Sequence, residues 1–103
     1  MAKIQRQSDR FNDFGRVESS ALSQIPGVLV NISKAGCKVH FPISLTVDMD
    51  ADYTLKIRPS RKNETAPFLL ICHPQWVKDE IGATTIGFNF LRSPDTGRLQ
   101  NYI

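Results

Sequence analysis

Apolar and polar residues alternate with a period of two along most of this chain, and this pattern constrains its fold more than any other feature. The clearest stretch is residues 53–58, which read Tyr-Thr-Leu-Lys-Ile-Arg. Such alternation is typical of β-strands that turn one face to a core and the other to water. Residues 36–41 and 84–91 repeat it. The sequence therefore predicts a mainly β protein.

Turn signals divide this pattern into six strands. We place them at residues 15–22, 28–33, 36–41, 53–58, 68–77 and 84–91. Ile25-Pro26-Gly27 is interpreted as the first turn, and residues 79–82 as the last. Short strands at this spacing are typical of a small antiparallel β-barrel, so we expect an all-β fold of six strands.

A short helix is expected at the C-terminus, where the pattern changes. Ser93 suits the N-cap, Pro94 suits the first helical position, and Asp95 suits the positive end of the helix dipole. Leu99 and Ile103 are four residues apart, so both can face the barrel. Gly97 weakens a helix, and for this reason we expect it to be short.

The chain has 103 residues, which is enough for one domain. Residues 1–13 are polar and lack a clean period, so we expect a flexible N-terminal arm there and a single barrel domain over 14–103. The longest unbroken apolar run, residues 68–72, is far shorter than the ~20 residues that a membrane span needs. Residues 1–15 show no signal-peptide pattern, so we expect a cytoplasmic protein.

The excess positive charge lies near the N-terminus. The whole chain carries 13 basic and 10 acidic residues, a net charge of +3. Residues 1–42 hold six basic and three acidic residues, whereas the seven basic and seven acidic residues of 43–103 cancel. This distribution favours an anionic partner that is met close to the N-terminus.

Signatures of enzymes and metal sites are missing from the sequence. It has no glycine-rich phosphate loop and no serine nucleophile elbow, and neither His40 nor His73 has an obvious paired nucleophile. Aspartates at 48, 50 and 52 have the spacing that opens a calcium loop, but Tyr53 replaces the required glycine and Pro59 the required glutamate. Each cysteine has a histidine nearby, but on strands these spacings send the side chains to opposite faces. We therefore expect no catalysis, no metal and no cofactor.

Two polar motifs remain as candidates for a binding site. Arg6 and Arg10 form an R-x-x-x-R in the N-terminal arm. Asn31, Ser33 and Gly36 form an N-x-S-x-x-G at the end of the second predicted strand. We expect Asn31 and Ser33 to project from the same strand face, outside the core, and Gly36 to let a flat ligand approach the backbone.

Together these motifs resemble the PilZ family, whose members bind the bacterial messenger cyclic di-GMP. That family carries R-x-x-x-R before its first strand and [D/N]-x-S-x-x-G at the end of its second. Residues 11–30 separate the two motifs here, as in the family. Gln75-Trp76-Val77 and residues 86–91 are similar to the family's later strands, and residues 98–103 to its terminal helix. The resemblance implies a PilZ-like barrel with a C-terminal helix.

The resemblance also implies roles for single residues. Arg6 and Arg10 would hold phosphates and stack on guanine, and arginine's planar fork suits both tasks. Asn31 and Ser33 would contact a guanine edge, and Gly36 would be the position of close approach. Trp76 would add an aromatic platform to the site, or else it belongs to the core.

We therefore predict a cyclic di-GMP receptor that orders its arginine arm over the ligand and signals through a protein partner. One alternative is a PilZ-like protein-interaction module that does not bind the nucleotide. The other is a small basic barrel that binds nucleic acid through the arm together with four basic residues, namely Lys56, Arg58, Arg61 and Lys62.

Overall fold

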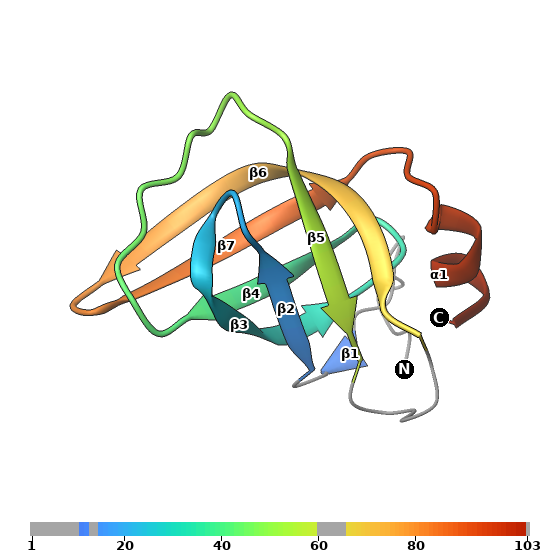
Figure 1. The fold of residues 1–103 in the computed structure, drawn as a ribbon, viewed down its shortest axis with the longest axis horizontal. Helices are drawn as coiled ribbons and strands as arrows, with labels where there is room; N and C mark the ends of the chain where they lie inside the picture. Colours follow the sequence, from blue (N-terminus) through green and yellow to red (C-terminus); the bar gives the residue numbers. More distant parts are fainter. Residues whose placement is uncertain (1–10, 13–14, 60–65, 103) are drawn as a thin grey trace, which may run out of the picture.

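The protein is described by a computed structural model, which places residues 11–12, 15–59 and 66–102. Within these residues, seven strands and one helix follow one another (Figure 1). Their bounds are β1 Phe11–Asn12, β2 Arg16–Ser19, β3 Ser23–Ile32, β4 Gly36–Phe41, β5 Tyr53–Arg58, β6 Phe68–Glu80, β7 Ala83–Phe90 and α1 Thr96–Tyr102.

Six of the strands close into an antiparallel barrel. The hydrogen-bonded order is β3-β2-β5-β6-β7-β4, and a further pairing of β4 with β3 completes the circle. The two-residue strand β1 lies outside this circle and pairs with the end of β3, with Phe11 opposite Ile32 and Asn12 opposite Asn31. The predictions of an all-β six-stranded barrel and of a short C-terminal helix are both confirmed.

Inward-facing side chains from every barrel strand form one core. In β5 the buried and exposed positions alternate strictly, as the period of two predicts. The largest fully buried side chains are Phe41, Phe68, Phe88, Leu29, Ile32, Leu55, Ile57, Leu70, Ile86, Leu99, Val17 and Val39. Burying each such side chain contributes about 1.5–3 kcal/mol, so this core is the main source of stability.

The first predicted turn is wrong. Residues 25–27 lie inside β3, and the chain instead turns at residues 20–22, where the Leu22 amide donates to the Ser19 carbonyl oxygen. Gly27 allows close packing against the neighbouring strand β4, because a Cβ there would lie 2.8 Å from side-chain atoms of Val39 and Phe41. The actual turn contains neither glycine nor proline, so it lacks the residues that most strongly predict a turn.

The segment before α1 follows the edge of β6 and anchors the helix there. Leu91 N donates to Ile71 O (2.7 Å), Ile71 N donates to Ser93 Oγ (2.8 Å), and Leu69 N donates to an Asp95 carboxylate oxygen (2.6 Å). The side chain of Ser93 therefore caps β6 rather than the helix, which begins at Thr96, so the predicted N-cap is wrong.

The helix itself packs over the start of β6. Leu99 is buried, and the Tyr102 ring meets the Phe68 ring edge-on at 5.4 Å between centroids. The Arg98 guanidinium lies 4.5 Å from the centre of the Phe68 ring and donates to the carbonyl oxygens of Pro67 and Ala66. These contacts close one end of the barrel.

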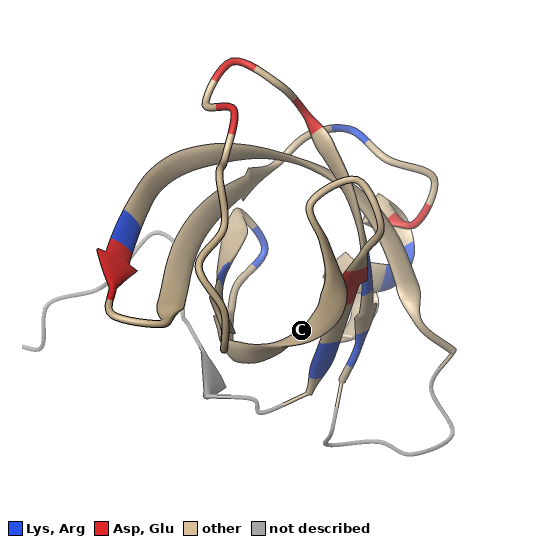
Figure 2. Cartoon of the chain, turned by 60° about the vertical axis from the view of Figure 1, so that its left-hand side comes forward, with Lys and Arg blue, Asp and Glu red and all other residues tan. Residues whose placement is uncertain are grey.

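The connection from β4 to β5 arches over another part of the barrel and carries a run of acidic residues (Figure 2). Leu45 N donates to Thr84 Oγ1 at 2.9 Å, and Asp48 N donates to the Tyr53 hydroxyl at 3.0 Å.

Of the predicted arm over residues 1–13, the structure describes only Phe11 and Asn12, which form β1. In the described part of the chain, no helix has the length and apolar character needed to cross a membrane.

Candidate functional site

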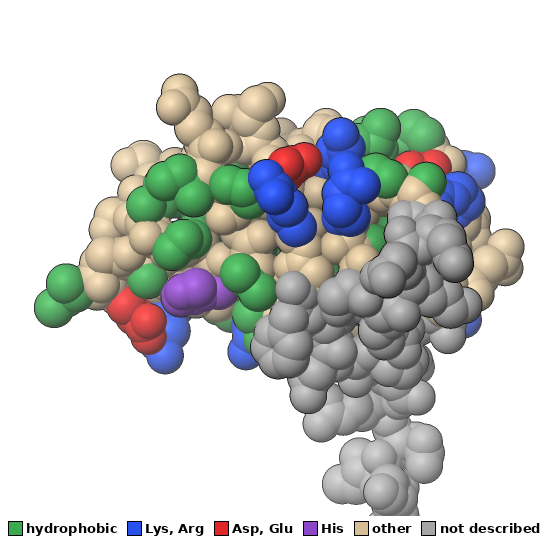
Figure 3. All heavy atoms as spheres, turned by 60° about the horizontal axis from the view of Figure 1, so that its bottom comes forward, with side chains coloured by type: hydrophobic (Ala, Val, Ile, Leu, Met, Phe, Trp, Pro, Cys, Tyr) green, Lys and Arg blue, Asp and Glu red, His purple; other side chains and the backbone are tan. Residues whose placement is uncertain are grey.

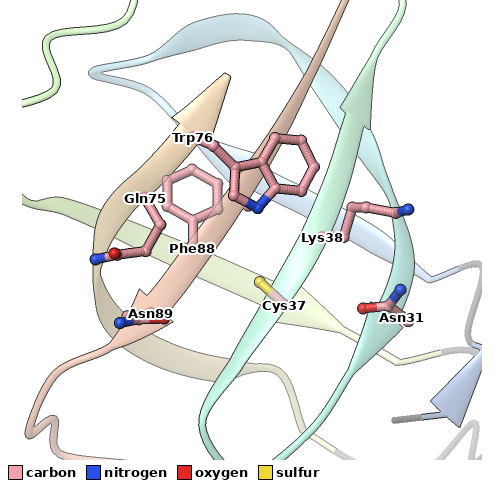
Figure 4. A pocket seen from close by; sticks show the side chains of 8 residues that line it. Asn31, Cys37, Lys38, Gln75, Trp76, Phe88 and Asn89 are labelled. Carbon is pink, nitrogen blue, oxygen red and sulfur yellow. The ribbon is translucent and has the colours of Figure 1, made fainter. Parts of the chain in front are cut away.

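A pocket of about 320 Å³ opens on the outer wall of the barrel, where β3, β4, β7 and β6 lie side by side. Its side chains come from four strands, and Trp76 lies between Gln75 and Asn89 on one side and Lys38 and Asn31 on the other (Figure 4). One indole, three amides and one ammonium group thus surround a single hollow. Such a set can stack on a flat ring and hydrogen-bond its edges.

The indole of Trp76 rests on the backbone of the neighbouring strand. A Cβ on Gly87 would lie only 2.3 Å from Cε2 and Nε1 of the indole, so only glycine leaves room for the ring in this position. The pairing of β6 with β7 shifts between Pro74 and Trp76, and this bulge leaves both Gln75 and Trp76 exposed on the outer wall. Trp76 is 43% exposed, so the reading of this residue as part of the core is wrong.

A second bulge shapes the opposite rim of the pocket. The pairing of β3 with β4 shifts between Leu29 and Asn31, after which Asn31 lies opposite Lys38. Both side chains are half-buried and line the pocket. Asn31 is therefore placed as predicted, outside the core, with a basic residue beside it.

Ser33 lies differently from the expectation. It follows the end of β3 and is fully buried, so it does not stand beside Asn31 on an outer face. Its hydroxyl oxygen accepts from Ala35 N at 3.1 Å and from Gly36 N at 3.3 Å, and Ser33 N donates to Gly36 O at 2.9 Å. The serine thus holds the tight turn that joins β3 to β4.

Gly36 allows two strands to approach each other. A Cβ at this position would lie 2.1 Å from the carbonyl oxygen of Phe88 on β7, a distance that no side chain tolerates. The close approach that was predicted for a ligand is made here by the backbone of β7. The predicted ligand roles of Asn31, Ser33, Gly36 and Trp76 remain predictions.

The two arginines of the R-x-x-x-R motif, Arg6 and Arg10, lie outside the described residues. The strand that follows Arg10 directly in the chain is β1, and its residue Asn12 pairs with Asn31 on the pocket rim. The two motifs, which are about twenty residues apart in the sequence, are therefore connected through β1.

Three polar pocket residues were not predicted as site residues by the sequence analysis, namely Lys38, Gln75 and Asn89. Lys38 and Asn89 occupy outward positions of strands that the alternation predicts correctly, so their exposure was foreseeable. Their convergence was not, because it depends on which strands become neighbours. Gln75 reaches the wall only through the bulge.

Each of the two histidines lies beside one polar side chain. His73 Nδ1 lies 2.8 Å from Asp52 Oδ1, and His40 Nδ1 lies 3.0 Å from Thr85 Oγ1. Burial, with a smaller effect of nearby Cys37, raises the pKa of the Cys72 thiol, so this sulfur stays protonated at neutral pH. Within the described ranges, no three His, Cys, Asp or Glu side chains gather as metal ligands would.

Comparison with solved structures identifies the fold. The chain superposes on the Bacillus subtilis inhibitor of motility (MotI/DgrA) with a TM-score of 0.74 at 17% identity, covering 97% of this chain and 49% of that one. It superposes on the PilZ domain of YcgR from Escherichia coli, solved with c-di-GMP, with a TM-score of 0.67 at 15% identity, covering 97% and 89% of the two chains. No family model and no curated protein matches the sequence.

These neighbours show that the chain has a PilZ-like fold. A larger complex of Escherichia coli YcgR with c-di-GMP gives the same result, with a TM-score of 0.65 at 14% identity over 95% of this chain and 44% of that one. This chain thus spans about half the length of the Bacillus subtilis protein. The resemblance deduced from the sequence is confirmed at the level of the fold.

Proposed function

We propose that this domain is a receptor for cyclic di-GMP and that the ligand binds at the pocket beside Asn31 and Trp76. One observation carries the proposal: a PilZ-like barrel brings the turn of the N-x-S-x-x-G motif, the strand that follows the R-x-x-x-R motif and an exposed indole to the same wall. Two structural neighbours were solved with this nucleotide.

The chemistry of the pocket suits a ligand with two guanines and two phosphates. The Trp76 indole offers a flat apolar surface on which a guanine can stack, a contact that contributes about 1–3 kcal/mol per base. The amides of Asn31, Gln75 and Asn89 both donate and accept, as a guanine edge requires. Lys38 adds a positive charge for a phosphate.

Arg6 and Arg10 complete the site in this proposal. Guanidinium groups bind phosphate in a bidentate manner and stack on purines, which an ammonium group cannot do. β1 provides the covalent route by which they reach the rim at Asn31. Ser33 and Gly36 act indirectly, because they fix the turn and the strand contact on which Asn31 and Lys38 depend.

We infer further that ligand binding orders the N-terminal arginine arm over the ligand and that a protein partner recognises the ordered arm. Segments that order on binding are a common means of switching. Amide hydrogen exchange over residues 4–14 is expected to slow when cyclic di-GMP is added. Exchange at an unchanged rate in a saturated complex would exclude this mechanism, while leaving binding itself intact.

Calorimetric titration of cyclic di-GMP tests binding directly. We expect saturable heat with the natural chain, loss of measurable binding in Arg10→Ala and an affinity at least about fivefold lower in Trp76→Ala. Arg92→Ala removes an exposed arginine from another part of the chain and should bind normally. Absence of both heat and a thermal shift in the natural chain would contradict the proposal and favour the nucleotide-free interaction module.

A further inference from the structure

A second feature of the barrel wall has no part in the proposed nucleotide site. Five residues on β2, β3 and β5 form it, and we call it the basic–apolar face: Arg16, Pro26, Val28, Lys56 and Arg58. Arg16 lies directly opposite Val28 on β3 and Arg58 on β5, so these three form a row across the wall. On the same side of the molecule, Figure 3 shows basic side chains around an acidic one, next to hydrophobic side chains.

Two like charges lie opposite each other on this face, and Glu18, opposite Lys56, is the carboxylate beside them. Arg16 and Arg58 are both exposed and occupy directly opposed positions of neighbouring antiparallel strands. Like charges in such a pair destabilise a sheet by about 0.2–1 kcal/mol. Glu18 contacts Arg16, with Oε2 3.1 Å from Nε, and it is the only acidic residue of β2 and β5. Three cations against one carboxylate leave an excess of positive charge.

Apolar surface accompanies the charge. Val28 is 41% exposed although it stands between Arg16 on β2 and His40 on β4, in a strand whose neighbouring residues Gly27 and Leu29 are buried. Pro26 shares its outward direction and lines a groove of about 440 Å³ with Arg16, Ser19, Ser23 and Gln24. Ser19 Oγ is buried and has no hydrogen-bond partner among the described residues.

The backbone beside the groove is closed to an added strand. Within the described chain, residues 23–27 of β3 pair with β2 but not with β4. The Ser23 hydroxyl donates to Ile25 O at 2.8 Å and accepts from Ile25 N at 3.0 Å, and Pro26 has no amide hydrogen. Such blocking is how proteins protect strand edges, so recognition on this face must occur through side chains.

We propose that the basic–apolar face docks a segment of a partner protein in which an aliphatic or aromatic residue is flanked by carboxylates. The apolar residue would cover Val28 and Pro26, and the carboxylates would pair with Arg16 and Arg58, which relieves their mutual repulsion. Complementary charge steers and orients such complexes, and desolvated arginine is enriched among the residues that dominate binding energy. The inference does not depend on nucleotide binding.

A phage-displayed library of random dodecapeptides, selected on the natural chain and depleted on a variant carrying Arg16→Glu, Arg58→Glu and Val28→Ser, tests the proposal. We expect enriched peptides with Asp or Glu on both sides of a large apolar residue. In fluorescence anisotropy, the combined variant should weaken their binding at least about tenfold. Matched controls are Arg92→Glu and Ile81→Ser, which change an exposed arginine and the fully exposed isoleucine of the β6–β7 turn and should bind normally.

Several outcomes overturn the proposal. They are enrichment of no peptide, enrichment of peptides without acidic residues, or equal weakening by the control variants. Binding of phosphatidylserine vesicles in place of peptides, or a concentration-dependent dimer that the combined variant abolishes, would assign the face to a membrane or to a second copy. If the combined variant melts early, Arg58→Glu and Val28→Ser are tested singly. Cyclic di-GMP binding is measured on the same variants. If it is retained, a loss of peptide binding does not come from damage to the nucleotide site.

Discussion

At the scale of single residues, the contact between Trp76 and Gly87 decides the shape of the candidate site. The indole occupies the space in which any other residue at position 87 would place its Cβ, 2.3 Å from two ring atoms. The position of the ring is therefore set by the absence of a side chain on the next strand. Since Trp76 is the only tryptophan of the chain, its fluorescence reports on this contact alone.

Gly87→Ala is expected to displace the indole from the wall. The variant should shift the tryptophan emission, lower the affinity for cyclic di-GMP and reduce the free energy of unfolding by about 1–3 kcal/mol through overpacking. Gly97→Ala is the matched control, because no atom lies within 4 Å of its added Cβ and alanine favours a helix by about 0.5–1 kcal/mol. An unchanged emission spectrum in Gly87→Ala would mean that the ring does not rest on this backbone.

A substitution can show whether Ser33 contacts the ligand or only holds the turn between β3 and β4. Ser33→Ala leaves the amides of Ala35 and Gly36 without the hydroxyl that accepts from them, so we expect a loss of about 1–3 kcal/mol in the ligand-free protein. Urea denaturation measures it, with the exposed Ser44→Ala as the control. A variant of natural stability that nevertheless loses nucleotide binding would instead assign the hydroxyl to the ligand.

At the scale of elements, the connection from β7 to α1 forms hydrogen bonds with the edge of β6, as a neighbouring strand would. Its side chains at Ser93 and Asp95 accept from the backbone amides of Ile71 and Leu69 on β6, where no further strand pairs. Backbone amides at a strand edge need hydrogen-bond partners, and here side-chain oxygens supply them. The helix is held in place by these bonds as well as by the burial of Leu99.

Ser93→Ala combined with Asp95→Ala is expected to loosen this attachment. Each change removes an acceptor, so we expect a loss of about 1–2 kcal/mol per substitution in the free energy of unfolding. Hydrogen exchange should accelerate at the amides of Leu69 and Ile71 and stay unchanged at Leu55 in the core. Arg92→Ala, which changes the exposed residue directly before Ser93, is the control. Uniform acceleration across the barrel would show a global rather than a local effect.

The elements also show which features the sequence could predict. β4, β5 and β7 were predicted nearly to the residue, because one face of each is buried and the alternation is regular. The start of β3 was missed, since Pro26 and Gly27 are typical of turns but serve here at an unpaired edge and in a crowded contact. The bulges that bring Trp76 and Asn31 to the pocket depend on strand pairing, which local patterns do not encode.

At the scale of the whole molecule, closure of the barrel explains how one short chain can present two distinct surfaces. β3 belongs to both: its last residues carry Asn31 on the pocket rim, and its first half carries Pro26 and Val28 on the basic–apolar face. The strand pairs with β2 along its first half and with β4 from Val28 onward. A ligand that rearranges β1 beside Asn31 would therefore act on a strand that also supports the second face.

The stability of this barrel should depend on pH through its core thiol. Burial raises the pKa of Cys72, so the folded chain keeps this proton at a pH at which the unfolded chain, whose thiol titrates near pH ~8.5, releases it. Below that pH, ionisation of the thiol does not change the free energy of unfolding. Above it, the free energy of unfolding falls by about 1.4 kcal/mol per pH unit, because only the unfolded chain releases the proton. Urea denaturation at several pH values should show this slope in the difference between the natural chain and Cys72→Ala. Parallel pH curves for the two proteins would mean that the thiol ionises within the folded barrel, and that the core around β6 admits water.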